Sequence, residues 1–325
     1  VVADLTEEKL AAHLFDSLRN KIMPLADDII VYPAHGAGSA CGKNMSKETS
    51  DTLGNQKKTN YALNPALTKE AFIKEVLHGL VAPPSYFPKN VLMNIQGYDS
   101  IDEVISRGTH ALSPDAFEEA ANETDAIILD TRKPFEFGAG FIPNSINIGV
   151  EGSFAVWVGT LITDIKQKIL LVTTPGKEQE VITRLARVGY DHAIGYLDGG
   201  FDAWKNAGKE TDSIVSVSVD EFANAEEKDP HILILDVRKK SEYDSEHIIN
   251  ALNTPLDFIN ESMQQIDKNK TYYVHCAGGY RSMIFASILR ARGYDNLIDV
   301  DGGFAAIKKS DKFKITDYVC PSTLL

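Results

Sequence analysis

The sequence contains two copies of one pattern. Residues 126–148 read AIILDTRKPFEFGAGFIPNSINI, and residues 232–254 read ILILDVRKKSEYDSEHIINALNT. An ungapped offset of 106 residues aligns Asp130 with Asp236 and also matches the arginine, glutamate, isoleucine and asparagine that follow each of them. Self-similarity at this spacing is typical of duplicated domains, so it constrains the fold more than any local motif does.

The second half of each copy repeats as well. The tetrapeptide DGGF stands at 198–201 and again at 301–304, after RVGYD in one copy and ARGYD in the other. We therefore predict two homologous domains at 109–212 and 213–325, preceded by a separate segment at 1–108.

Each copy alternates short apolar runs with helical patterns. IILDT and ILLVT in the first copy, and ILILDV and TYYVHC in the second, show no polar alternation and therefore indicate strands buried on both faces. Helical candidates such as EVITRLARVG end at a glycine. The pattern predicts an α/β fold of two tandem doubly wound domains with parallel sheets, in which sites form at the carboxyl ends of strands.

Composition excludes several classes of protein. The chain has 325 residues, a formal charge of −13 and a pI near 5.1, so nucleic acid is not expected as a partner. No apolar run approaches the ~20 residues that cross a bilayer, so no membrane association is expected. Three widely spaced cysteines favour a reducing, cytoplasmic location over a disulfide framework. The first residue is Val, which suggests a processed or truncated product, and a homo-oligomer remains open.

One cysteine stands where chemistry is expected. In YYVHCAGGYRS, residues 272–282, Cys276 follows a strand and precedes an almost wholly apolar helix. Backbone N–H groups of residues 277–281 could converge on its sulfur, and the helix N-terminus and Arg281 would favour a thiolate or a negatively charged persulfide. The alternative is a structural cysteine in a tight turn.

The second copy resembles a rhodanese domain. DVRKKSEYDSEHIINALNTPL, HCAGGYRS and RARGYDNLIDVDGGFAAI are the landmarks of that family in its order. The resemblance implies that Cys276 carries sulfane sulfur as a persulfide, that Arg281 stabilises the anion, and that no cofactor is required. It also implies a set of substrate-binding residues: Ala277, Gly278, Gly279, Tyr280 and Ser282. The six-residue loop from Cys276 to Arg281 matches sulfurtransferases, whereas related phosphatases and arsenate reductases have one residue more.

The first copy lacks this chemistry. Its loop reads VTTPGKEQE, and no cysteine stands between Cys41 and Cys276, so Thr173 or Thr174 replaces the thiol. Glu178 and Glu180 are expected to repel an anionic sulfur species. We interpret this copy as a degenerate domain retained for packing or docking, and Asp236, Arg238 and Glu242 of the second copy as groups that bind the loops around the site.

The first hundred residues carry a different resemblance. IIVYPAHGAGSACGK and NPAL are similar to the last part of a metallo-β-lactamase-fold domain of the glyoxalase II and persulfide dioxygenase type. The family's other metal-binding motifs do not occur here, so 1–108 is expected to be a remnant with an incomplete metal site at His35. Fe(II), or Zn, is expected only in an intact domain. Cys41 is a candidate accessory thiol or a thiol without a role. Cys320 is interpreted as incidental, with a resolving thiol as the alternative.

Together these features predict a persulfide dioxygenase–rhodanese fusion that acts on small-molecule persulfide, thiosulfate and sulfite. Two other functions stay open. One is a catalytically silent interaction module, and the other is a small phosphatase or arsenate reductase, which the short loop disfavours.

Overall fold

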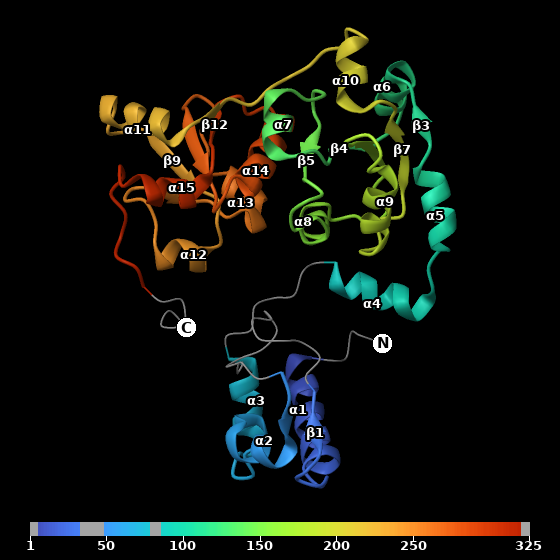
Figure 1. Cartoon of the computed structure of the whole chain (residues 1–325), viewed down its shortest axis with the longest axis vertical. Coiled ribbons are helices and arrows are strands. Elements are labelled where there is room, and N and C mark those ends of the chain that lie inside the picture. The colour runs from blue at the N-terminus through green and yellow to red at the C-terminus, as the bar shows by residue number, and fades with distance from the viewer. Residues whose placement is uncertain (1–5, 33–48, 79–85, 320–325) are drawn as a thin grey trace. The chain divides into compact units, whose positions relative to one another are not determined.

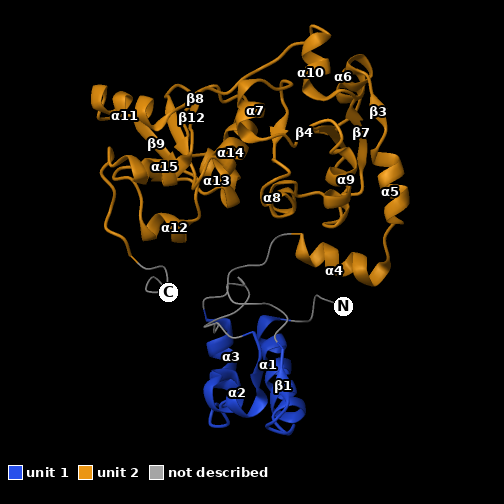
Figure 2. Ribbon diagram, in the orientation of Figure 1, with its two compact units in different colours: residues 1–82 blue, residues 83–325 orange. Residues whose placement is uncertain are grey.

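The computed structural model describes residues 6–32, 49–78 and 86–319 (Figure 1). The chain divides into two compact units, Val1–Ala82 and Pro83–Leu325 (Figure 2). Each unit is described by itself.

The first unit pairs helices with a short antiparallel ribbon. Its elements are α1 (Glu7–Ser17), η1 (Leu18–Ile22), β1 (Ile30–Val31), β2 (Asp51–Thr52), α2 (Leu53–Thr59), η2 (Tyr61–Leu63) and α3 (Lys69–Leu77). Thr6 and Thr68 cap α1 and α3 with side-chain oxygens that accept from Lys9 N and Ala71 N. Phe72 of α3 is buried, and its ring lies edge-on to that of Phe15. The apolar run IIVY forms a strand over two residues, and both are exposed.

The first repeat begins after two helices that pack on it. The elements are α4 (Phe87–Gln96), α5 (Ile101–Gly108), β3 (Ala111–Leu112), α6 (Pro114–Glu123), β4 (Ile127–Asp130), α7 (Pro134–Ala139), β5 (Ile146–Asn147), α8 (Phe154–Leu161), β6 (Ile169–Val172), α9 (Glu178–Ala186), β7 (Ala193–Leu197) and α10 (Gly200–Asn206). Val104 of α5 is buried, and Gly108 lies against Ile182 of α9. These helices therefore belong to the second compact unit, although the sequence assigned them to the segment before residue 109.

The second repeat follows the same order of strands. Its elements are β8 (Ser216–Val217), α11 (Val219–Lys228), β9 (Leu233–Asp236), α12 (Lys240–Ser245), β10 (Leu252–Asn253), η3 (Leu256–Phe258), α13 (Ile259–Met263), β11 (Tyr272–His275), α14 (Tyr280–Ala291), β12 (Leu297–Val300) and α15 (Gly303–Ser310). Ser218 caps α11 in a capping box with Glu221, where the sequence pattern S-x-x-E predicts a helix start.

The two sheets have the same topology. The strand order is β3-β7-β6-β4-β5 in the first repeat and β8-β12-β11-β9-β10 in the second, and every neighbouring pair is parallel. Helices cover both faces of each sheet, so the central strands are buried; all four residues of β6 are inaccessible (Figure 1). The prediction of an α/β fold with two tandem domains and parallel sheets is confirmed.

Helix α14 packs against both repeats. Every residue from Ser282 to Leu289 is buried, which explains why this helix has no polar face. Met283 and Phe285 of α14 belong to the same hydrophobic cluster as Phe137 and Ile148 of the first repeat. The two repeats therefore share one core, and α14 lies within it.

Candidate active site

Cys276 lies directly after β11, at the carboxyl end of the central strand. Its side chain is buried, with 1% of its surface exposed. The backbone N–H of Gly279 donates to Cys276 Sγ at 3.2 Å. Gly279 has a φ of +94°, a conformation that glycine adopts without strain, and it immediately precedes α14. The loop thus turns one amide and a helix N-terminus toward the sulfur.

The DGGF segment of the second repeat binds the backbone of the Cys276 loop. Phe304 N donates to Cys276 O at 2.7 Å, and Ala305 N donates to Ala277 O at 3.0 Å. The backbones approach so closely that a Cβ on Gly303 would lie 2.6 Å from Cys276 O. Gly303 also has a φ of +56°, so two independent constraints demand glycine there.

The predicted ring of amides is only partly present. Among the described hydrogen bonds, Gly279 N–H is the donor to Sγ, and residues 277, 278, 280 and 281 contribute none. Ala277 and Gly278 are exposed, while Ser282 is buried in α14. The loop is open on the side of Ala277 and Gly278, which is where a ligand could approach.

Arg281, which the sequence predicts to stabilise an anion on the sulfur, is held in an ion pair with Glu242. Its Nη1 and Nη2 donate to Glu242 Oε2 and Oε1 at 2.6 and 2.8 Å, a bidentate ion pair with α12. Burial opposes ionisation of Glu242, yet the Arg281 guanidinium holds the pKa of that carboxyl below its usual range. The guanidinium is therefore a tether between the loop and α12, and its positive charge is shared with Glu242.

A second ion pair fixes the end of β9. Arg238 donates from N, Nε and Nη2 to the Asp236 carboxylate, and its guanidinium stacks on the Phe304 ring. The first repeat builds the same network from Asp130, Arg132 and Phe201. Because the network recurs where no thiol exists, we assign it to loop packing and not to sulfur chemistry.

His275 precedes the cysteine and is fully buried. Burial lowers the pKa of His275, although nearby Asp236 acts in the opposite direction. Its ring stacks on Phe304, so it packs the sheet face opposite the cysteine. Desolvation thus favours the neutral imidazole at this buried position.

Thr173 occupies in the first repeat the position of Cys276. It directly follows β6, and a Cβ on Gly200 would lie 2.9 Å from Thr173 O, as one on Gly303 would approach Cys276 O. The sequence left Thr173 and Thr174 as alternatives, and the strand register selects Thr173. Its Oγ1 is buried and has no hydrogen-bond partner in the described residues.

The two acidic groups of the first loop have local partners. Glu178 Oε1 accepts from Gly176 N at 2.9 Å, and Glu180 forms ion pairs with Lys177 and Arg184. Glu180 is therefore paired with two cations, whereas Glu178 forms no ion pair among the described residues, and repulsion of an anion by Glu178 stays a prediction.

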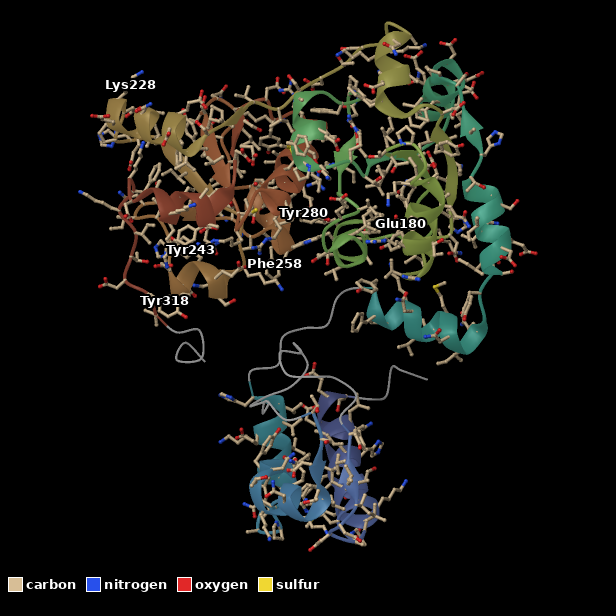
Figure 3. The ribbon with its side chains drawn as sticks, in the orientation of Figure 1. Glu180, Lys228, Tyr243, Phe258, Tyr280 and Tyr318 are labelled. Carbon is tan, nitrogen blue, oxygen red and sulfur yellow. The ribbon has the colours of Figure 1, made fainter. Side chains whose placement is uncertain are left out.

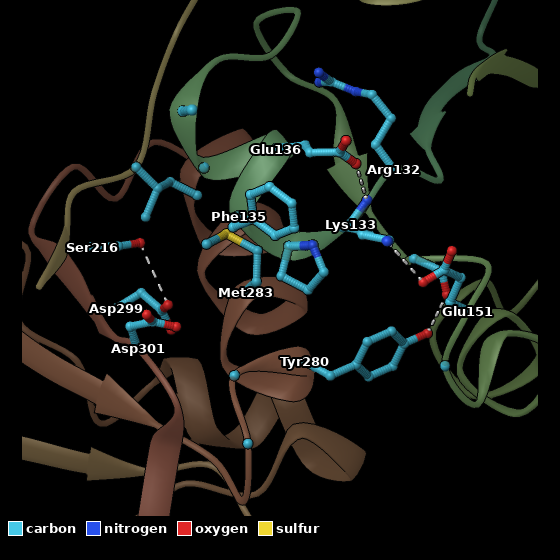
Figure 4. A pocket seen from close by; sticks show the side chains of 18 of the residues that line it. Arg132, Lys133, Phe135, Glu136, Glu151, Ser216, Tyr280, Met283, Asp299 and Asp301 are labelled. Carbon is cyan, nitrogen blue, oxygen red and sulfur yellow. Dashed lines mark hydrogen bonds and ion pairs between the residues drawn. The ribbon is translucent and has the colours of Figure 1, made fainter. Parts of the chain in front are cut away.

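A cavity of about 910 Å³ lies between the two repeats (Figure 4). Its walls include the strand ends and loops of the first repeat and the loop and helix start of the second. The lining residues include Gly149, Gly152, Ser216, Gly278, Gly279, Tyr280 and Asp299. Sequence reasoning missed this cavity because its walls come from segments more than a hundred residues apart.

Asp299 is a buried ionisable group in the cavity wall. Only 4% of it is exposed, and burial raises the pKa of Asp299 to about 7. Its Oδ2 accepts from Ser216 Oγ at 3.5 Å, whereas Oδ1 has no hydrogen-bond partner within the described ranges.

The structure does not describe the predicted metal ligand, the candidate accessory thiol or the third cysteine. His35, Cys41 and Cys320 lie outside the described residues. In the part of the chain that the structure describes, no group of three histidine, cysteine, aspartate or glutamate side chains could hold a metal ion. The described residues thus do not fit an iron or zinc site.

The comparison with protein families agrees with the duplicated fold. The family model for the rhodanese-like domain matches residues 113–207 and again residues 218–310. Since these two matches cover more than half of the chain, the protein belongs to the rhodanese-like domain family.

Individual relatives are similar over shorter stretches. Thiosulfate sulfurtransferase GlpE of Coxiella burnetii is 35% identical over 77 residues, which cover 24% of this chain and 72% of the relative. YrkF of Bacillus subtilis strain 168 is 27% identical over 126 residues, or 39% of this chain and 60% of the relative. The tRNA sulfurtransferase of Thermoplasma acidophilum is 45% identical over 62 residues, or 19% and 12% of the two chains. The chain thus spans less than two thirds of the length of YrkF and of the tRNA sulfurtransferase.

Among solved structures, a metallo-β-lactamase from Staphylococcus aureus is 24% identical, with a TM-score of 0.43. The match covers 58% of this chain and 49% of the metallo-β-lactamase chain. The assignment of residues 1–108 to such a domain stays a prediction.

No helix in the described ranges is both long and apolar enough to span a membrane.

Proposed function

We propose that the protein is a sulfurtransferase that carries sulfane sulfur as a persulfide on Cys276. The Cys276 thiolate attacks the outer sulfur of a donor such as thiosulfate, and the S–S bond of the donor breaks. Sulfite leaves with the bonding electron pair, and a Cys276 persulfide anion forms. A nucleophilic acceptor, such as a thiolate or sulfite, then takes the terminal sulfur and releases the cysteine thiolate. No redox cofactor enters this balance.

The observation that carries the proposal is the Gly279 N–H on Cys276 Sγ at the start of α14. A donor amide and a helix N-terminus stabilise negative charge on sulfur, and a persulfide anion needs the same stabilisation. The similarity to GlpE over most of that relative's length supports the same reaction class.

The finer proposal is that the chain is part of a persulfide dioxygenase–rhodanese fusion. In that setting an intact iron domain would oxidise a thiol persulfide with O₂ to sulfite, and Cys276 would move sulfur between persulfide, sulfite and thiosulfate. The support is the PAHGAGSACGK segment around His35, together with the two rhodanese-like domains. Because the other metal-binding motifs do not occur in this chain, we expect metal analysis after addition of Fe(II) to find no stoichiometric iron. Stoichiometric iron in this chain would contradict the assignment of residues 1–108 to an incomplete metal domain.

Intact-mass analysis after incubation with thiosulfate tests sulfur transfer. We expect a gain of one sulfur atom that maps to the Cys276 peptide, and no gain in Cys276→Ser. Cys320→Ser is the control and should load like the parent. Loading at another cysteine, or none in the parent, would contradict the proposal.

A catalytically silent interaction module is the second candidate, because Cys276 is 99% covered and Arg281 is already paired. In that case Cys276 would react slowly with iodoacetamide and would not take sulfur from thiosulfate. Fast alkylation with sulfur loading would rule this candidate out.

A further inference from the structure

We propose that the first repeat, which lacks a thiol, positions the sulfur-carrying loop of the second repeat through Tyr280. This inference rests on the proposed sulfur transfer and gives the first repeat a role in it. Tyr280 is a positioning residue here, in place of the substrate-binding role that the family resemblance implied.

Tyr280 crosses from one repeat to the other. Its hydroxyl donates to Gly149 O of the first repeat at 2.7 Å, across 131 residues of sequence (Figure 4). Figure 3 shows the side chain at the edge of the second repeat that faces the first. Burial raises the pKa of Tyr280 far above its usual value, so the phenol stays neutral and remains a donor.

The first repeat has a slot that fits this ring. A Cβ on Gly152 would lie 2.3 Å from ring atoms of Tyr280, and one on Gly149 would lie 3.2 Å away. The offset of 106 residues that relates the repeats places Pro255 and Phe258 at these two positions. The second repeat therefore has no such slot. The first repeat needs glycine at these two positions because a side chain there would collide with the Tyr280 ring.

The relationship runs in one direction. Gly176 and Gly279 both have positive φ and stand three residues after Thr173 and Cys276, so Lys177 is the counterpart of Tyr280. The ammonium group of Lys177 pairs with Glu180 within its own repeat. Among the contacts of the described residues, the loop that bears the cysteine is anchored in the opposite repeat, and the Thr173 loop is not.

Further contacts hold α14 in the same orientation. Asn147 N of the edge strand β5 donates to Ser287 Oγ at 2.9 Å. Arg290 donates from Nε and Nη2 to the Asp212 carboxylate at 2.7 and 2.8 Å. The helix that starts beside Cys276 thus takes its position from both repeats.

The link to the sulfur is short. Gly279, whose N–H donates to Cys276 Sγ, is bonded directly to Tyr280. A ring displaced from the slot moves the first turn of α14 and therefore the donor amide. Because the slot lies in the first repeat, a change there alters the chemistry of a cysteine more than a hundred residues away.

The test compares two glycines of the first repeat. Gly152→Ala puts a methyl group against the ring of Tyr280. The matched control is Gly159→Ala in α8, which puts a methyl group 2.0 Å from the ring of Tyr86. At equal folded fraction, we expect Gly152→Ala to lower kcat of sulfur transfer about tenfold and to slow alkylation of Cys276, and Gly159→Ala to leave both within about twofold. Tyr280→Phe keeps the ring and loses one hydrogen bond, so about a fivefold loss is expected.

The pH profile of Cys276 alkylation separates positioning from general destabilisation. Gly152→Ala and Tyr280→Ala should shift it toward higher pH, whereas Arg290→Ala, which weakens the same interface farther from the loop, should not. Equal effects of Gly152→Ala and Gly159→Ala, or an unchanged profile in Tyr280→Ala, would overturn the inference. If the parent protein takes no sulfur from thiosulfate, the proposed function fails instead, and the alkylation profiles still decide the positioning.

Discussion

The backbone N–H of Phe304 donates to the carbonyl oxygen of Cys276 at 2.7 Å, so the start of α15 supports the sulfur-carrying loop. The close approach requires Gly303, and the first repeat has the equivalent Gly200 beneath Thr173. This pair of glycines allows a test in which one copy serves as the control for the other.

We expect Gly303→Ala to abolish most sulfur transfer. Its Cβ would lie 2.6 Å from Cys276 O at a φ of +56°, so the loop must move and the positive φ adds about 1–3 kcal/mol of strain. Gly200→Ala, with φ +64° and a contact of 2.9 Å to Thr173 O, should cost similar stability and keep the activity of the folded fraction. Urea denaturation and a thiosulfate assay on both variants measure the two effects, and parallel losses of activity would contradict the assignment.

Thr173→Cys should not restore sulfur transfer in a Cys276→Ser background. The new cysteine would lie at the equivalent strand end. However, α9 begins two residues after Gly176, whereas α14 begins directly after the equivalent Gly279. The first loop also has Glu178 where the second has Arg281. Mass analysis after thiosulfate treatment should show no persulfide at residue 173. A loaded Cys at that position would mean that strand placement alone is sufficient.

The tether between Arg281 and Glu242 predicts coupled effects. Arg281→Ala should slow turnover about tenfold or more and leave Glu242 unpaired, and Glu242→Gln should cost about 1 kcal/mol because the pair is partly exposed. If the tether is the main role of Arg281, the double variant should be no slower than Arg281→Ala. Multiplicative losses in a double-mutant cycle would show that Arg281 also acts on the sulfur independently of Glu242.

Asp299 makes stability depend on pH. The folded-state pKa of Asp299, about 7, lies above the reference of 3.8, so the folded state favours the protonated carboxyl. The stabilisation from this preference is fully present below the reference pKa and is lost as pH rises through about 7. Asp299→Asn should therefore stabilise the protein at about pH 8 by at most about 4 kcal/mol, and by much less at about pH 5. Urea midpoints at the two pH values measure this difference. Asp301→Asn, at an exposed neighbour, is the control, and an equal gain in both variants would exclude the burial of Asp299 as the cause.

Local sequence patterns were sufficient for the fold and for the position of the cysteine. The repeat around Asp130 and Asp236 set the strand register, and the apolar strand before Cys276 placed it at a carboxyl end. These features depend on neighbours close in sequence or on matching copies, which one chain displays directly.

The long-range partners were not predictable in the same way. Arg281 meets Glu242 across 39 residues and Tyr280 meets Gly149 across 131, and no local pattern encodes either contact. A signal for the second was present: Gly149 and Gly152 break the repeat by standing opposite Pro255 and Phe258, while residues 282–289 lack any polar face. Departures from an internal repeat can therefore indicate where two copies touch.

The bond between Asn147 and Ser287 has a consequence for synthesis on the ribosome. Asn147 belongs to an edge strand, and the hydroxyl that covers its N–H is encoded 140 residues later. At about 5–20 residues per second, roughly 7 to 30 s pass before that partner is made. Throughout this interval the nascent first repeat exposes an uncovered strand edge, the kind of surface on which neighbouring chains pair and aggregate.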